Sequence, residues 1–193
     1  MELLYGGFES LSHQATDTEA LEVSKQVFNF VNLNLKNSYT VDEAKARMER
    51  YCAYQERCHK EVRHKLKEMR MIPEAIDLII GHLLQHNYLN ETRFAQAFAR
   101  GKFRTKKWGK ARIVRELKFR DISAYNIKKA LAEISEADYH TTFHELAEKR
   151  WNQLAGETNK VYKKKKFSDY LMYRGWESHW IWEKLASLTE NKS

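Results

Sequence analysis

Glycine and proline are scarce in this sequence, whose 193 residues include only seven glycines and one proline. A sheet protein with many hairpins needs more turn-forming residues than that. Hydrophobic residues make up 42% of the chain, which is enough to build a core. The composition therefore favours an all-α fold before any periodicity is considered.

Cysteine is also rare, and long apolar runs are missing. Cys52 and Cys58 lie in one predicted helix, six residues apart, so their side chains point in different directions and do not bridge easily. We therefore expect no disulfide framework and a reducing compartment. No segment resembles a membrane span, and the N-terminus lacks the basic and apolar blocks of a signal peptide. These features lead us to expect a cytoplasmic protein that does not contact a membrane.

The common catalytic motifs are absent as well. The chain has no glycine-rich phosphate loop, no GxSxG, no HExxH and no cysteine pair at zinc-finger spacing. His82 and His86 are four residues apart on a predicted helix and could share a metal ion, but two histidines alone make a weak site. We favour an ordinary, partly exposed pair. The sequence thus predicts a non-enzymatic protein without cofactor, metal or small-molecule substrate.

Positive charge dominates the chain, but it is unevenly spread. The net charge is +8, whereas residues 1–39 hold two Lys/Arg and five Asp/Glu and therefore carry −3. The remaining residues carry +11, which suggests a polyanionic partner: nucleic acid, an acidic protein surface or an anionic membrane. A soluble helical protein with excess lysine is the alternative interpretation.

Residues 1–39 form the least interpretable segment, which we describe as an acidic, partly flexible N-terminal extension. Residues 19–35 have the pattern of a helix with apolar residues on one side. Within them, residues 27–35 alternate polar and apolar side chains, as a short strand would. Both possibilities stay open.

Capping signals mark several helix starts further along the chain. Thr40 and Glu43 have the spacing of a capping box, which predicts a helix to about residue 57. A second helix is expected over 59–70. Pro73 suits the first turn of a third helix, which continues to about residue 86. Asn90 is a favourable N-cap for the helix that follows.

An internal repeat becomes visible when Leu66, Leu117 and Leu171 are aligned. The positions four before and five, ten and fourteen after each leucine are apolar in all three copies. They are Val62, Ile113 and Phe167; Met71, Ile122 and Trp176; Ile76, Ile127 and Ile181; and Ile80, Leu131 and Leu185. The leucine shares a helix face with the residue four before it, and the last two positions share a face of the next helix. The alignment also places Pro73 level with Ala124, just after the candidate N-cap Ser123.

The repeat predicts a tandem array of three three-helix units, at 40–87, 88–134 and 135–193. Helices of this length are not stable alone, so neighbouring helices must pack against one another. The expected architecture is an elongated, curved array rather than a compact bundle.

Ten basic residues and a single acid, Glu116, lie between residues 100 and 120. Clustered like charge repels itself and is relieved by a polyanion, although a solvated helix face is the alternative. Trp108 interrupts the run and could stack on a base, insert into a protein groove or seal the joint between helices. With the later lysine run, the candidate partner-binding residues are Arg100, Arg104, Lys106, Lys107, Trp108, Lys110, Arg112, Arg115, Lys118, Lys163, Lys164, Lys165 and Lys166.

Two motifs in this region give a specific resemblance. They read Tyr88-Leu89-Asn90-Glu91-x-Arg93-Phe94-Ala95-x-x-Phe98 and Trp108-Gly109-x-x-Arg112-Ile113-x-x-Glu116-Leu117. Together they resemble the signature of the RecX family of bacterial recombination regulators. The resemblance is closest over 88–131, extends more loosely over 40–189 and excludes 1–39. The Lys-Gly-apolar corner of that family is Arg120-Asp121-Ile122 here, and glycine is kept only at Arg174-Gly175-Trp176.

The resemblance implies a regulator that binds the filament of the RecA recombinase on DNA. Such a protein would lie in the groove of the filament and limit its strand-exchange, ATPase and co-protease activities in recombination, repair and the SOS response. DNA would be contacted weakly or through the filament, and we expect a monomer. The alternative is a direct DNA-binding protein, with Arg112 and Arg115 on a helix that enters a groove as in helix-turn-helix proteins.

Overall fold

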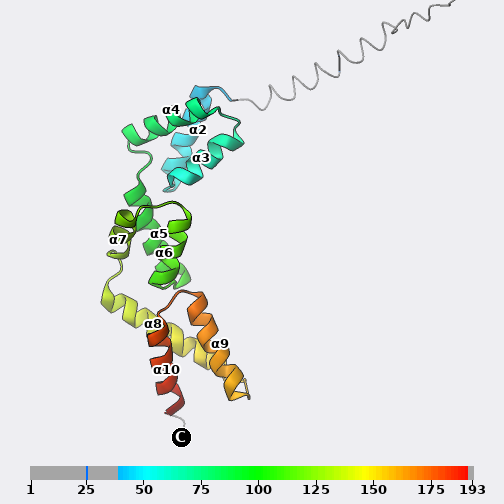
Figure 1. Cartoon of the computed structure of the whole chain (residues 1–193), viewed down its shortest axis with the longest axis vertical. Coiled ribbons are helices and arrows are strands. Elements are labelled where there is room, and N and C mark those ends of the chain that lie inside the picture. Colours follow the sequence, from blue (N-terminus) through cyan, green and yellow to red (C-terminus); the bar gives the residue numbers. More distant parts are fainter. Residues whose placement is uncertain (1–24, 26–38, 191–193) are drawn as a thin grey trace, which may run out of the picture. The chain divides into compact units, whose positions relative to one another are not determined.

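The computed structural model describes Lys25 and residues 39–190 (Figure 1), and every regular element between residues 39 and 190 is a helix. The helices are α2 (Val41–Tyr54), α3 (His59–Glu68), α4 (Pro73–Gln85), α5 (Glu91–Lys106), α6 (Lys110–Phe119), α7 (Ala124–Leu131), α8 (Glu136–Gln153), α9 (Lys160–Tyr173) and α10 (Ser178–Glu190). The expected all-α fold is therefore confirmed for this range. The acidic extension 1–39, and the helix or strand expected within 19–35, lie outside the described residues apart from Lys25 and Tyr39.

The predicted helix starts agree with the structure. Glu43 accepts a hydrogen bond from the Thr40 N–H at 2.9 Å and donates its own N–H to Thr40 Oγ1 at 3.2 Å, which completes the capping box. Pro73 is the first residue of α4. The side chains of Asn90 and Ser123 cap α5 and α7. These starts depend on local chemistry, which is why the sequence alone could locate them.

The end of α2 differs from the expectation and separates the two cysteines. The helix stops at Tyr54 because Gln55 adopts an extended conformation, with φ −155° and ψ 142°. Cys58 then caps α3, so the prediction that both cysteines lie in one helix was wrong. Both thiols are free and buried, and burial raises the pKa of Cys52 to about 11.

The aligned apolar positions form the centre of each helical group. Leu66, Leu117 and Leu171 have no exposed surface, and neither do the three residues four positions before them. Of the fifteen aligned side chains, only Met71 and Leu131 are half-buried rather than buried. Within the groups, α2 and α3 pack on α4, α5 packs on α6 and α7, and α9 packs on α8 and α10. This packing supports our proposal of three units at 40–87, 88–134 and 135–193.

The corner after the second helix has the same backbone in all three copies. The residue four after each aligned leucine is left-handed: φ is 60° at Arg70, 61° at Asp121 and 83° at Gly175. The next N–H then donates to the carbonyl of the aligned leucine, at 3.1, 3.1 and 3.2 Å. This hydrogen bond defines a Schellman motif. The corner geometry therefore persists although only the third copy keeps glycine.

Asp121→Gly is expected to stabilise the protein by roughly 0.5–1 kcal/mol, because glycine adopts the left-handed conformation without a Cβ clash. The gain is reduced by loss of the exposed ion pair between Asp121 and Lys60, at 3.1 Å. Urea denaturation of both proteins measures the difference. Asp121→Ala serves as the comparison, because it removes the same ion pair but keeps the strained φ; equal stability of the two variants would contradict the argument.

Candidate partner-binding surface

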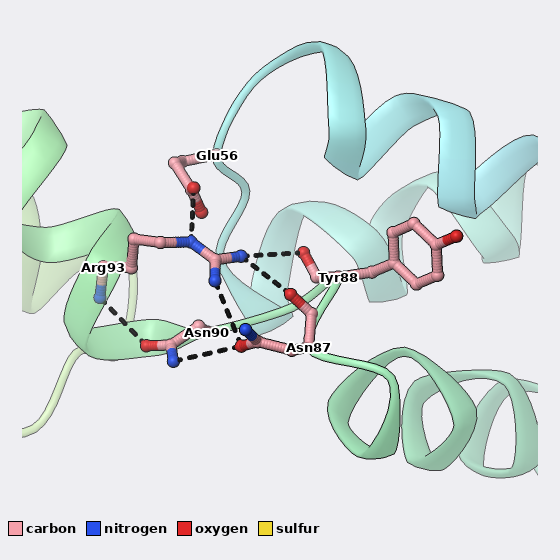
Figure 2. A network of polar contacts seen from close by, with 5 residues as sticks. All are labelled: Glu56, Asn87, Tyr88, Asn90 and Arg93. Carbon is pink, nitrogen blue, oxygen red and sulfur yellow. Dashed lines mark hydrogen bonds and ion pairs between the residues drawn. The ribbon is translucent and has the colours of Figure 1, made fainter.

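The motif that begins at Tyr88 connects the first helical group to the second (Figure 2). Asn87 is left-handed, with φ 58°, and turns the chain between α4 and α5. The Arg93 guanidinium donates to the Asn87 carbonyl at 2.9 Å, to Asn87 Oδ1 at 3.0 Å and to Glu56 Oε1 at 2.5 Å. Asn90 Oδ1 accepts from the Arg93 N–H at 3.0 Å. Arg93 therefore holds the turn before α5 against the segment after α2.

A second polar contact ties α3, α5 and α7 together. The Asn126 side chain is 8% exposed and donates to Glu91 Oε2 at 2.8 Å. Its oxygen accepts from Thr92 Oγ1 at 2.7 Å. The other Glu91 oxygen lies 3.4 Å from His59 Nδ1. The side chains of Glu91 and Thr92, in the motif that begins at Tyr88, therefore have hydrogen-bond partners within the protein.

The turn after α5 contacts the corner between α9 and α10. The Gly109 N–H donates to the Arg174 carbonyl at 2.8 Å, and the Trp176 indole N–H donates to the Lys107 carbonyl at 3.1 Å. The Arg174 guanidinium also donates to the Lys106 carbonyl at 2.5 Å. Residues about seventy positions apart in sequence therefore join the second helical group to the third.

Two glycines permit this contact. A Cβ atom on Gly109 would lie 2.2 Å from the Gly175 carbonyl oxygen, and one on Gly175 would lie 2.3 Å from the Arg112 backbone nitrogen. Both distances are far below van der Waals contact with backbone atoms that cannot rotate away. The glycine of the second motif, Gly109, is therefore required for this close backbone packing.

Tyr139 joins three helices at the same junction. Its hydroxyl accepts from the Lys110 N–H at 2.8 Å and donates to Glu177 Oε2 at 2.8 Å, while the side chain is 1% exposed. Its ring lies 4.6 Å from that of Trp176. Burial raises the pKa of the Tyr139 hydroxyl well above its usual value, so the group stays protonated and able to donate.

Tyr139→Phe is expected to destabilise the protein by about 1–3 kcal/mol, because the Lys110 N–H and the Glu177 carboxylate lose a buried partner. Urea denaturation followed by circular dichroism measures the loss. The control is Tyr162→Phe, which removes a hydroxyl from a side chain that is 59% exposed and should change stability by less than about 0.5 kcal/mol. Equal effects would show that the Tyr139 hydroxyl contributes nothing to the junction.

Several of the predicted basic residues have internal partners. Arg112 donates to the Tyr173 carbonyl at 2.9 Å, and its guanidinium lies 4.2 Å from the centre of the Trp108 ring. Lys110 pairs with Glu136 at 2.5 Å, and Arg100 pairs with Glu133 at 2.6 Å. Reversing the charge of Arg100, Lys110 or Arg112 would therefore disturb the fold as well as the binding of any partner.

Trp108 is half-buried and packs against the core of the second and third groups. Its ring centre lies 6.3 Å from that of Phe98 and 5.5 Å from Lys102 Nζ. Of the three roles considered for Trp108, these contacts support the seal between helices.

Four of the predicted basic side chains in this region face solvent. Arg104, Lys106, Arg115 and Lys118 are exposed, and within residues 39–190 their side chains make no ion pair or hydrogen bond. Arg115 and Lys118 lie one turn apart on α6, opposite the face that carries its buried residues. Lys107 is half-buried and left-handed, with φ 53°, at the end of α5. We call Arg104, Lys106, Arg115 and Lys118 the exposed basic group.

The later lysine run is mostly engaged with neighbouring side chains. Lys163 Nζ lies 4.4 Å from the centre of the Trp151 ring, Lys165 pairs with Asp169 at 2.6 Å, and Lys166 pairs with Glu157. Lys164 is exposed and has no side-chain partner in the described part of the chain. Together with Lys163, it lines a cavity of about 480 Å³ between α8, α9 and the end of α10.

His82 and His86, the pair considered as a metal site, have hydrogen-bond partners of their own. His82 Nε2 lies 2.6 Å from Glu49 Oε1, and His86 Nδ1 lies 3.0 Å from the His82 carbonyl oxygen. Among the described residues, no three histidine, cysteine or acidic side chains are grouped closely enough to hold a metal ion.

No helix within the same range is long and apolar enough to cross a membrane.

Repeated three-helix groups, joined by buried polar contacts and bearing exposed cations, define a basic helical-repeat protein. The model of the family region described as "RecX, second three-helix domain" matches residues 90–131. The Regulatory protein RecX of Chlorobium phaeobacteroides is 31% identical over 135 residues, which cover 69% of this chain and 85% of that protein. The chain therefore belongs to the RecX family of regulatory proteins.

Two further comparisons agree with this assignment. The Regulatory protein RecX of Clostridium acetobutylicum is 31% identical over 132 residues, which cover 67% of this chain and 61% of that relative. The chain thus spans about three fifths of the length of this relative. The crystal structure of RecX from Lactobacillus salivarius shares the fold, with a TM-score of 0.65, 23% identity and coverage of 77% of this chain and 96% of that one.

Proposed function

We propose that this protein binds the filament that RecA forms on DNA and modulates its recombinase, ATPase and co-protease activities. Membership of the RecX family carries the proposal, because relatives 31% identical to this chain are named regulatory proteins. The role is non-enzymatic and requires no cofactor or small-molecule substrate. A partner that assembles on DNA implies that the protein acts in the bacterial cytoplasm. We further propose that it acts as a monomer.

The exposed basic group supplies the chemistry for this partner. A nucleoprotein filament carries regularly spaced phosphates, and cations that approach them release condensed counterions, which favours binding. We assign the first contacts to Arg104, Lys106, Arg115 and Lys118, because these side chains are exposed and keep their full charge available. Lys107 and Lys164 are the next candidates.

The other predicted residues have an indirect role in this proposal. Arg112 and Trp108 hold the junction of the second and third groups, and Lys110 and Arg100 are paired with acids. They position the helices that carry the exposed cations. Lys163, Lys165 and Lys166 are likewise held by neighbouring side chains.

Two assays of RecA test the proposal directly. The DNA-dependent ATPase and the strand-exchange activity of RecA are measured with increasing amounts of the full chain. Both should fall at amounts equal to or below that of RecA, and the protein should sediment with RecA filaments on single-stranded DNA. No change in either activity at equal amounts would reject the proposal.

Direct DNA binding is the second candidate, favoured by the position of Arg115 and Lys118 on one exposed face of α6. It predicts tight binding to naked duplex DNA, a visible sequence preference and a steep loss of affinity with added salt. Weak and non-specific binding to naked DNA, beside tight binding to the filament, would reject DNA recognition as the main role.

A further inference from the structure

A second pair of histidines, His140 and His144 on α8, has the same four-residue spacing as His82 and His86 but a different geometry. The two Nε2 atoms lie 2.9 Å apart, whereas the ring centres are 4.2 Å apart, with 53° between the ring planes. The nitrogens are therefore closer together than the rings that carry them. At this distance one Nε2–H donates to the lone pair of the other nitrogen, so the pair shares a single proton.

A charged cavity lies next to this pair. It has a volume of about 260 Å³ and is lined by both histidines, Phe143, Trp180, Glu183 and Lys184, the last three from α10. Glu183 is exposed and makes no hydrogen bond or ion pair within the described range. The Lys184 ammonium also faces His144, and Glu148 Oε1 pairs with it at 2.8 Å.

We propose that His140 and His144 form a binding site for a divalent transition metal ion, with Glu183 as the third ligand. Two nitrogens in neighbouring positions of a square or octahedral site, each about 2.0–2.1 Å from the ion, lie about 2.9 Å apart. The observed separation of the Nε2 atoms is 2.9 Å. Cu²⁺ and Ni²⁺ accept this arrangement, whereas tetrahedral Zn²⁺ places the nitrogens further apart and requires a small movement of the rings.

Binding requires two changes from the arrangement described above. The shared proton must leave, because both lone pairs are needed by the metal ion. The Glu183 carboxylate must also turn toward the histidines, since among the described residues no three such side chains are already close enough.

His82 and His86 provide an internal control. His82 Nε2 is held by Glu49 at 2.6 Å, and the ring of His86 is bonded to the His82 carbonyl through Nδ1 at 3.0 Å. Equal spacing in sequence therefore does not give equal availability of nitrogen lone pairs. The proposal is independent of RecA binding.

Isothermal titration of the untagged, chelator-treated full chain with NiCl₂ and CuCl₂ at pH 7.5 tests the site. We expect one ion per chain, a loss of affinity of at least about tenfold in His140→Gln and in His144→Gln, and unchanged binding in His82→Gln. Glu183→Gln should weaken binding less than either histidine change. Far-ultraviolet circular dichroism establishes that each variant is folded.

Three results would overturn the proposal. The first is no saturable binding by the unaltered chain, and the second is equal binding by His144→Gln. The third is a loss of binding in His82→Gln that matches the loss in the α8 variants. Unchanged affinity in Glu183→Gln would overturn the assignment of Glu183 as a ligand.

Discussion

Gly109→Ala is expected to destabilise the folded protein by about 3 kcal/mol, because the added methyl group overlaps backbone atoms of the third helical group. The new Cβ would lie 2.2 Å from the Gly175 oxygen and 2.7 Å from the Trp176 nitrogen. Relief requires the turn at Gly109 to move away, which breaks its hydrogen bond to the Arg174 carbonyl. Equilibrium unfolding in urea measures the loss.

Gly101→Ala is the matched control for this change. Gly101 lies within α5, and a Cβ atom there has nothing within 4 Å. Alanine should stabilise the helix at this position by roughly 0.5–1 kcal/mol, so the two substitutions should act in opposite directions. A Gly109→Ala protein as stable as the unaltered chain would show that the two backbones do not pack as described.

Reversing the charge of Arg115 and Lys118 together is expected to weaken binding to RecA filaments on single-stranded DNA by at least about tenfold, which corresponds to 1.4 kcal/mol. Each reversal removes a cation and places an anion near phosphates. Both side chains are exposed and unpaired within the described residues, so stability should change by less than about 0.5 kcal/mol. Fluorescence anisotropy of the labelled protein, titrated with filaments, measures affinity, and thermal unfolding measures stability.

Lys67→Glu is the matched control for Lys118→Glu. Lys67 follows Leu66 as Lys118 follows Leu117, and both lysines are exposed. The two variants have the same net charge and alter the same position of the repeat, but only Lys118 lies in the basic region. Equal losses of affinity would indicate a general effect of net charge and contradict a specific surface on α6.

Arg112→Glu would be a less informative variant, even though the sequence placed Arg112 among the partner-binding residues. The arginine donates to the Tyr173 carbonyl and stacks on Trp108. Its replacement would change folding and binding together. Substituting only the exposed cations separates the effect on binding from the effect on folding.

The helices and their buried faces were predictable from the sequence because they depend on near neighbours. The capping residues Thr40, Asn90 and Ser123 act within three residues of themselves. The aligned leucines and their partners share helix faces through the regular 3.6-residue period. The same spacing of apolar positions also recurs in all three aligned copies, which made the pattern recognisable in the sequence.

The junctions could not be predicted in this way. Arg174 reaches the Lys106 carbonyl, and Tyr139 reaches Glu177, across long stretches of chain with no periodic signal. A basic side chain in sequence looks the same whether it faces solvent, as Arg115 does, or a carbonyl, as Arg112 does. The left-handed corner at Asp121 was also not predicted, because an aspartate in a sequence does not by itself require a positive φ.

The continuous core of the second and third groups has a consequence for cooperativity. Cys58 and the buried side chains from Phe94 to Leu185 form one cluster, and the Tyr139 hydroxyl bridges α6 and the start of α10 within it. When neighbouring units of a repeat array are strongly coupled, they open together as one cooperative unit. Hydrogen exchange at the protected amides of α5 to α10 should therefore report a single opening free energy, and Tyr139→Phe should lower it by the same amount in all six helices.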